Sequence, residues 1–132
     1  MDSRLRGNDD KYLREFQSHM DCIFCKIAAG AIPAKIIHED DLAVALEDLS
    51  PQAPVHVLVI PKKHISTSLD ISVEDNALVG HLFQVANKIA IAKGIAARGF
   101  RMVMNCNAEA GQSVFHIHLH VMGGRPMGWP PG

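Results

Sequence analysis

Three histidines alternate with apolar residues near the end of the chain, in the run His116-Ile117-His118-Leu119-His120. Successive side chains of a β-strand point to opposite faces. The three imidazoles should therefore form a row on one face, with neighbours about 6–7 Å apart, while Ile117 and Leu119 enter the core. A solvated face normally mixes Lys, Glu, Thr and Ser, so a row of histidines indicates either a metal site or covalent or acid–base catalysis by imidazole.

Small and polar residues flank this run on both sides. Gly111-Gln112-Ser113 precedes it and Gly123-Gly124 follows it. Glycines allow a ligand to approach the backbone closely, and Gln112 and Ser113 offer neutral hydrogen-bond donors. Such donors suit a phosphoryl centre, whose charge must be held while a group leaves. The chain has no P-loop and no G-x-G-x-x-G motif, so phosphorus chemistry here would use a phosphohistidine-type intermediate.

A second group of candidate ligands lies near the start of the patterned sequence. Cys22 and Cys25 form a C-x-x-C pair, which alone is a weak zinc signal because four ligands are needed. His56 lies within an apolar run, where a lone histidine is more often a hydrogen-bonded core residue. Cys106 has no partner in the sequence and is interpreted as a buried small residue. Three further histidines are interpreted as ordinary surface or interface residues: His38, His64 and His81.

The elements that must position these residues follow from apolar periodicity and turn signals. The pattern predicts a short helix between Asp21 and Gly30, a hairpin from residues 35–39 and 42–47, a central strand over 55–60, a long helix from Ser72 to Gly94, and strands over 100–106 and 113–122. This order predicts an α+β fold with a mostly antiparallel five-stranded sheet covered by helix, in two layers.

Composition limits the class of protein. The chain has 132 residues, a net charge of -1 and 48% hydrophobic residues, which fits one globular domain. No basic cluster indicates nucleic-acid binding, and no apolar run is long enough to span a membrane. Residues 1–19 are charged and lack a clean period, so we expect a poorly ordered extension before a domain at 20–132. Three cysteines and no visible export signal favour the cytoplasm.

Several segments together resemble the histidine triad (HIT) superfamily, and in particular its Hint branch, the nucleoside phosphoramidases. The histidine run fits the family pattern H-φ-H-φ-H-φ-φ, in which φ is apolar. The other similar segments are Ser50-Pro51-Gln52-Ala53-Pro54, Val59-Ile60-Pro61-Lys62-Lys63-His64, Gly111-Gln112-Ser113-Val114-Phe115 and Trp129-Pro130-Pro131-Gly132. The resemblance leaves out residues 1–20 and implies a HIT-like fold.

The resemblance implies a hydrolase that cleaves the P–N bond of purine nucleoside 5′-phosphoramidates, without a required cofactor. In the family the middle histidine, here His118, attacks phosphorus and forms a covalent nucleotidyl-histidine. The last histidine, here His120, contacts the phosphate and the leaving group, and Ser113 matches a hydroxyl that helps to protonate the leaving amine. The implied substrate contacts are Asp48 at the ribose, Asn105 and Gln112 near the phosphate and sugar, and Ile23, Phe24, Ile27, Ile32 and Leu49 around the purine.

The role of His116 stays open between two alternatives. Some HIT proteins and the related uridylyltransferases bind structural zinc through a cysteine pair, a strand histidine and the first triad histidine. Carried over, these zinc ligands are Cys22, Cys25, His56 and His116. Hint-branch members commonly lack the cysteines, and there the two histidines form an orienting network instead.

Family members are homodimers, so the resemblance also implies a second copy of the chain as a partner. Gly128 stands where many Hint proteins have a histidine, and Phe115 replaces a frequent tyrosine. Two other functions are weighed. A dinucleoside polyphosphate hydrolase of the Fhit-like branch is disfavoured by the Trp-Pro-Pro-Gly tail, and a nucleotide-binding interaction module with weak catalysis is disfavoured by the intact histidine row beside Ser113.

Overall fold

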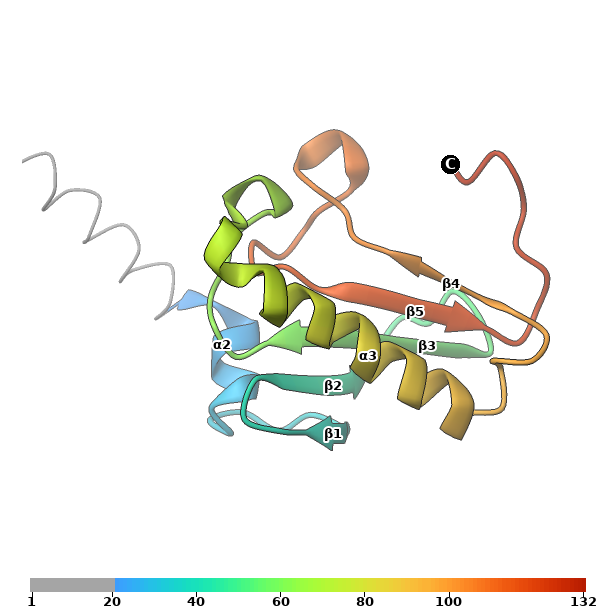
Figure 1. The fold of residues 1–132 in the computed structure, drawn as a ribbon, viewed down its shortest axis with the longest axis horizontal. Coiled ribbons are helices and arrows are strands. Elements are labelled where there is room, and N and C mark those ends of the chain that lie inside the picture. The colour runs from blue at the N-terminus through green and yellow to red at the C-terminus, as the bar shows by residue number, and fades with distance from the viewer. Residues whose placement is uncertain (1–20) are drawn as a thin grey trace, which may run out of the picture.

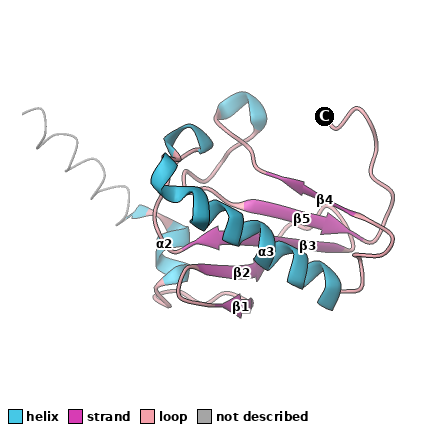
Figure 2. Ribbon diagram, in the orientation of Figure 1, coloured by secondary structure: helices cyan, strands magenta, loops and turns pink. Residues whose placement is uncertain are grey.

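The computed structural model describes residues 21–132, so the extension predicted for residues 1–19 lies outside the described part. The elements are α2 (Ile23–Ala28), β1 (Ile36–Glu39), β2 (Ala43–Glu47), β3 (Val55–Pro61), α3 (Asn76–Ala92), β4 (Phe100–Val103) and β5 (Leu119–Gly123), with short 3-10 turns η1 (Ser68–Asp70), η2 (Val73–Asp75) and η3 (Ala108–Ala110) (Figures 1 and 2). No helix within residues 21–132 combines the length and apolar character needed to cross a bilayer.

The five strands form one sheet in the order β1-β2-β3-β5-β4, and every neighbouring pair is antiparallel. The β-branched run of β3 occupies the centre, where both of its edges are paired. In its register with β5, Leu58 lies opposite His120 and Val59 lies opposite Leu119. The predicted α+β fold with a five-stranded antiparallel sheet is confirmed.

The main core lies between the sheet and α3, which crosses one face of the sheet in Figure 1. The buried residues of α3 recur at helical spacing: Leu82, Val85, Ala86, Ile89 and Ala90. They pack on alternate residues of the strands, among them Val57, Val59, Leu119 and Val121. The helix is preceded by η2, where the Asp75 carboxylate accepts hydrogen bonds from the Ser72 amide and hydroxyl.

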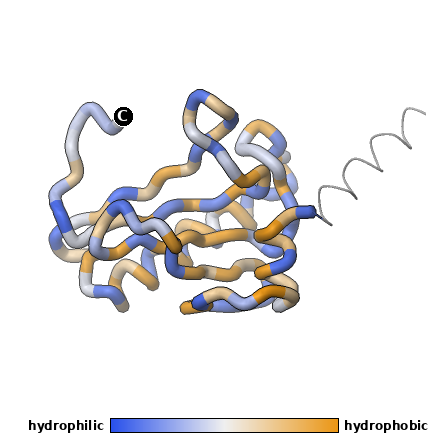
Figure 3. The backbone as a smooth tube through the Cα atoms, turned by 180° about the vertical axis from the view of Figure 1, so that it is seen from behind, coloured by the Kyte–Doolittle hydropathy of each residue, from blue (hydrophilic) through white to orange (hydrophobic). Residues whose placement is uncertain are grey.

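The opposite face of the sheet carries α2 and a second apolar cluster. Phe24 and Ile27 of α2 pack on Val44, Leu46, Leu58 and Ile60 of the strands. Seen from behind in Figure 3, hydrophobic stretches run along these strands. Because Val57 and Val59 face α3, His56 must face α2, and by the same alternation His120 does as well. The sheet thus brings the histidines of β3 and β5 to one face.

Three predicted elements differ from the structure. The helix α2 is capped by Cys22 instead of Asp21, because the Cys22 thiol accepts the Cys25 amide. The strand predicted over 100–106 ends at Val103, and the strand predicted over 113–122 begins only at Leu119. Pairing of β5 with β3 stops there, near Pro61, which has no N–H to donate to a ladder. His116 therefore lies in a bend and His118 in an irregular segment just before the strand.

Candidate active site

A backbone carbonyl engages one ring nitrogen of His118 and leaves the other available. Its side chain is buried, and its Nδ1 lies 2.8 Å from the His116 carbonyl oxygen. A carbonyl only accepts, so Nδ1 carries the proton and Nε2 keeps its lone pair. The edge of Phe24 packs against the ring, with centroids 5.1 Å apart. This arrangement presents a fixed, unprotonated nitrogen, which is what a nucleophilic histidine requires.

His120 belongs to a hydrogen-bonded chain that begins in the loop before β3. The Gln52 amide donates to His56 Nδ1 at 2.9 Å, and His56 Nε2 lies 2.8 Å from His120 Nδ1. An amide can only donate, so His56 Nδ1 is unprotonated and the proton of the neutral ring is on Nε2. His56 therefore donates to His120 Nδ1, which leaves the proton of His120 on Nε2. The chain makes His120 a neutral donor beside the His118 ring, whose centroid is 5.0 Å away.

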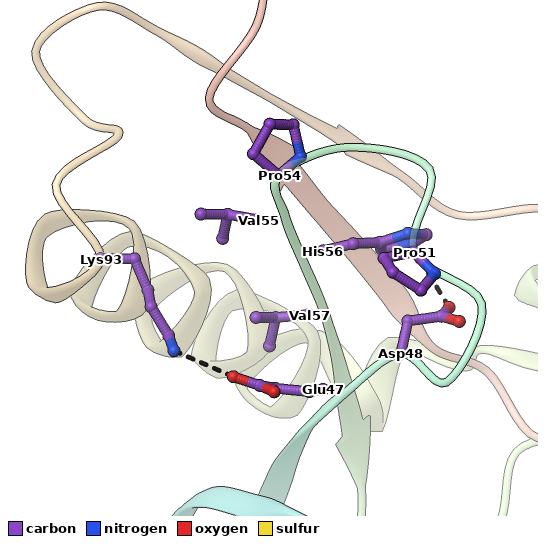
Figure 4. Close-up of a pocket in the computed structure, with 8 residues that line it drawn as sticks. All are labelled: Glu47, Asp48, Pro51, Pro54, Val55, His56, Val57 and Lys93. Atoms are coloured by element: carbon purple, nitrogen blue, oxygen red, sulfur yellow. Dashed lines mark hydrogen bonds and ion pairs between the residues drawn. The ribbon is translucent and has the colours of Figure 1, made fainter.

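Electrostatics favour the neutral forms of His120 and His56. Burial, with a smaller contribution from His118 and His56, lowers the pKa of His120 to about 4. Burial also lowers the pKa of His56, against the opposing effect of Asp48, whose Oδ2 lies 3.4 Å from His56 Nε2. Asp48 and His56 are seen together in Figure 4, on the side of β3 away from Lys93. Asp48 supports the proton on His56 Nε2, because a carboxylate attracts an N–H.

The third histidine of the run faces a different set of groups. His116 Nδ1 lies 3.3 Å from Cys22 Sγ and 3.5 Å from Cys25 Sγ, and His64 Nδ1 lies 3.2 Å from Cys25 Sγ. Donor atoms of all four side chains lie within 4.8 Å of one another. Burial, together with the neighbouring Cys22 thiol, raises the pKa of Cys25 to about 12, so without a metal its thiol stays protonated.

These four side chains fit a structural zinc ion in donor type, spacing and tautomer. Two thiols and two imidazoles are a common tetrahedral zinc set, and its S···N edges are about 3.6 Å from ordinary bond lengths. His116 Nε2 lies 2.7 Å from the Pro61 carbonyl oxygen, so it carries the proton and leaves Nδ1 as the ligand atom. The contacts that support this fit are those among the four side chains and the contact of His116 with Pro61.

The structure does not bring His56, predicted as a zinc ligand, to the two cysteines. Both of its ring nitrogens are used by Gln52 and His120, and it groups with Asp48 and His120 instead of with the cysteines. His64, which the sequence analysis interprets as an ordinary surface or interface residue, lies beside Cys25 instead. The signal that identifies it is strand register: pairing Val59 with Leu119 carries His116 past the end of β3, toward His64.

Two other histidines are also more than surface residues. His38 Nε2 and His81 Nε2 lie 2.6 Å and 2.8 Å from Asp40 Oδ2, which links the β1–β2 turn to α3. Burial would raise the pKa of Asp40, but hydrogen bonds from the two histidines and from the Leu42 and Ala43 amides lower it strongly. Cys106 is half-buried instead of fully buried. Hydrogen bonds from Ser68, Leu69 and Thr67 lower its pKa.

The predicted polar contacts with substrate divide into two kinds. The buried Gln112 side chain is already used, because its Oε1 accepts the Asn107 amide at 2.8 Å and its Nε2 donates to the Ser66 and Val114 carbonyls. It therefore shapes the loop before His116. Ser113 is exposed, and Asn105 is half-buried at the end of β4. Asp48 Oδ1 accepts the Ser50 amide at 2.8 Å, which holds the loop that follows β2.

The apolar residues predicted around a purine are only partly assembled. Phe24 and Ile27 are buried in the α2 cluster, and Ile32 is packed against it. Ile23 is 48% exposed and lines a hollow with Ser113, whereas Leu49 is 99% exposed. Ile23 and Ser113 thus share one surface, and Leu49 is not among the residues that line it.

Comparison with known proteins agrees with this geometry. Residues 29–127 match the HIT domain family. An uncharacterized HIT-like protein of Synechocystis sp. is 54% identical over 112 residues, which cover 85% of this chain and 97% of that protein. The purine nucleoside phosphoramidase of Escherichia coli (strain K12) is 49% identical over 106 residues, covering 80% of this chain and 89% of the enzyme.

Solved structures of HIT family proteins also resemble this chain in fold and in sequence. The crystal structure of a HIT family hydrolase from Legionella pneumophila Philadelphia 1 superposes with a TM-score of 0.84 at 50% identity, covering 85% of this chain and 100% of that one. A histidine triad protein from Clostridium difficile gives a TM-score of 0.80 at 47% identity, covering 83% and 95% of the two chains. These values extend the likeness over the whole sheet and both helices.

Proposed function

Because this chain belongs to the HIT domain family, we propose that it is a hydrolase cleaving the P–N bond of purine nucleoside 5′-phosphoramidates. The observation that carries the proposal is the pair of opposite tautomers at its centre. His118 offers a lone pair at Nε2, and His120 offers an N–H at Nε2. One nitrogen can attack phosphorus while the other donates to the group being displaced or to a phosphoryl oxygen.

In the first step His118 Nε2 bonds to phosphorus and the P–N bond to the amine breaks. An amine leaves far more easily once it is protonated, and the exposed Ser113 hydroxyl and His120 Nε2–H are the donors for that proton. In the second step water adds to phosphorus, its proton passes to the group that protonated the amine, and the bond to His118 breaks, which releases the nucleoside monophosphate. The His116 carbonyl accepts a hydrogen bond from His118 Nδ1–H throughout and stabilises positive charge on the His118 ring.

Substrate recognition is proposed to use the groups around this pair. Asp48 is suited to accept from ribose hydroxyls, because its carboxylate lies beside the His56–His120 chain and is anchored by Ser50. Asn105 and backbone groups near Gln112 would contact the phosphate and sugar. The purine would lie against the apolar residues predicted for it: Ile23, Phe24, Ile27, Ile32 and Leu49.

We also propose that Zn²⁺ binds at Cys22, Cys25, His64 and His116. The thiol–imidazole distances of 3.2 to 3.5 Å and the tautomer of His116 support this set. When bound, the ion supplies a structural cross-link between α2 and the segment before β5 that carries the nucleophile. His116 would then contribute to both the catalytic site and the metal site, because its carbonyl orients His118 while its ring holds the metal.

A homodimer is proposed on the basis of the family resemblance and of one sheet edge. Within the described residues β4 pairs with β5 alone, so its outer edge can be covered by a second copy. Sedimentation velocity on the full chain tests this, and a monomeric mass at micromolar concentration would contradict it.

The decisive test is hydrolysis of adenosine 5′-phosphoramidate by the wild type and by His118→Ala. We expect turnover by the wild type and a loss of at least about 10²-fold in the variant, because the covalent route is removed. Mass spectrometry of quenched reactions should find a nucleotidyl adduct in the wild type alone. The matched control is His81→Ala, a histidine on the far side of the sheet, which should keep its activity.

Other outcomes separate the alternatives. Faster cleavage of a diadenosine polyphosphate than of the phosphoramidate favours a dinucleoside polyphosphate hydrolase. Nucleotide binding with no turnover of either substrate favours an interaction module. Equal rates for His118→Ala and the wild type would refute the nucleophile assignment.

A further inference from the structure

The loop between β2 and β3 contacts the buried ring of His56, which in turn is hydrogen-bonded to His120. Pro51 and Gln52 are exposed, yet the Gln52 amide donates to the buried ring of His56 at 2.9 Å. The loop has few internal supports, which are the Ser50 amide on Asp48 and the Gln52 side chain on the Ser50 carbonyl. An exposed loop of this kind needs an external anchor if its amide is to stay in place.

That anchor comes from the other end of the chain, just after β5. Arg125 Nη2 and Nε donate to the Gln52 carbonyl at 2.8 Å and 3.3 Å, so one oxygen accepts two hydrogen bonds from one edge of the guanidinium. Its Nη1 donates to the Pro126 carbonyl at 3.0 Å, which fixes the side chain. Gly124, at φ +93°, packs so closely on Pro54 that an added Cβ would lie 2.9 Å from the proline Cβ. The segment after β5 therefore lies directly against the loop.

We propose that Arg125 is a positioning residue for catalysis, which acts through Gln52 and His56 to keep the proton of His120 on Nε2. The expected effect on the rate rests on the proposed function, but the expected effect on the tautomers of His56 and His120 does not. Gln52 is held on both sides of its Cα, by His56 at its amide and by Arg125 at its carbonyl. Fixing both groups restricts the two backbone dihedrals between them, and so aims the amide at the His56 ring.

Loss of the hydrogen bonds between Arg125 and the Gln52 carbonyl should change the protonation of His56. With the Gln52 amide aimed at Nδ1, a proton on that nitrogen would face another donor, so both the Nδ1–H tautomer and the imidazolium are disfavoured. Without the amide, water can satisfy a protonated Nδ1. His56 Nε2 can then accept from His120 Nδ1, and His120 presents a lone pair to the substrate where a donor is needed. A lone pair at that position repels phosphoryl oxygens.

The effect should be partial, because Asp48 also favours a proton on His56 Nε2. We expect Arg125→Ala to lower kcat about three- to tenfold with little change in KM, the usual size for one solvent-exposed hydrogen bond. Arg125→Lys should be intermediate, since an ammonium can still donate to Gln52 but loses the fork geometry. Arg98→Ala is the matched control: Arg98 lines the same hollow as Arg125 but makes no described contact with Gln52.

The first experiment is nitrogen NMR of the histidine rings in the full chain without substrate. In the wild type and in Arg98→Ala, His56 should be the Nε2–H tautomer and should resist protonation. In Arg125→Ala, His56 should become a mixture of tautomers with a higher pKa. An unchanged His56 signal and titration in Arg125→Ala would overturn the proposal, whatever the activity.

The second experiment is the pH dependence of kcat for the same variants. The acid limb should move to higher pH in Arg125→Ala and return toward the wild type when guanidinium ion is added. A loss of activity with no shift of the acid limb would mean that Arg125 only stabilises the fold. If the wild type turns over no phosphoramidate, the proposed function fails, and the NMR result still decides the role of Arg125.

Discussion

Replacing His64 with glutamine should remove the proposed zinc ion, whereas replacing His56 with glutamine should leave it in place. His56 lies within β3 and His64 lies just beyond the end of that strand, and only His64 contacts Cys25, at 3.2 Å between Nδ1 and Sγ. His56 instead has both ring nitrogens engaged by Gln52 and His120. The pair of substitutions therefore compares two buried or half-buried imidazoles, of which one is in the metal set.

The expected size of the effect follows from the free energy of zinc binding. Structural zinc sites of four ligands bind with about 10–16 kcal/mol, or roughly 2.5–4 kcal/mol for each ligand if the ligands share it equally. Loss of His64 should therefore weaken zinc binding by about 10²–10³-fold. For a domain of about 110 residues, the entropy of unfolding converts this loss into a melting temperature lower by roughly 10–17 °C in excess zinc.

The assay combines metal content with thermal melting. Protein purified without added zinc is analysed for metal by mass spectrometry, and melting is followed with and without a chelator. The wild type and His56→Gln should contain near-stoichiometric zinc and lose stability when chelator is added, while His64→Gln should contain little and respond little. Stoichiometric zinc in His64→Gln, or its loss from His56→Gln, would refute the ligand assignment, and a zinc-free wild type would refute the site.

Further predictions concern pH and packing. Activity should be level from about pH 6 to 8 and decline below about pH 5, because His120, with a pKa of about 4, is a neutral donor above about pH 5. A decline of activity centred near pH 6.5 would contradict the role of His120 as that donor. Asp40→Asn should destabilise the fold by about 1–2 kcal/mol at neutral pH, because the hydrogen bonds that lower the Asp40 pKa are to its charged form. That contribution is complete above about pH 5 and is lost as the pH falls below about 4, so denaturant melts of wild type and variant should converge at low pH. Gly123→Ala should cost about 1–3 kcal/mol, because the added Cβ would lie 2.7 Å from Ile95 Cδ1, and Ile95→Val in the same chain should recover part of the loss in a double-mutant cycle.

The sequence by itself determined the fold class and the faces of the strands. Apolar periodicity placed the long helix, and alternation placed Ile117, Leu119 and Val121 in the core, where the structure has them. The same alternation separated the histidines from the core. These predictions succeed because they depend on local geometry, in which the direction of a side chain follows from its position in a helix or strand.

Only the tertiary structure decided which histidine serves which purpose. The row of three divides into two groups, because β5 begins at Leu119 and His116 turns toward Cys22 and Cys25. His64 joins them and His56 does not, since antiparallel pairing brings the residues before Leu119 to the far end of β3. The contact of Arg125 with Gln52 spans the sequence in the same way. Such contacts depend on strand register and loop packing, which a pattern of residue types along one chain does not contain.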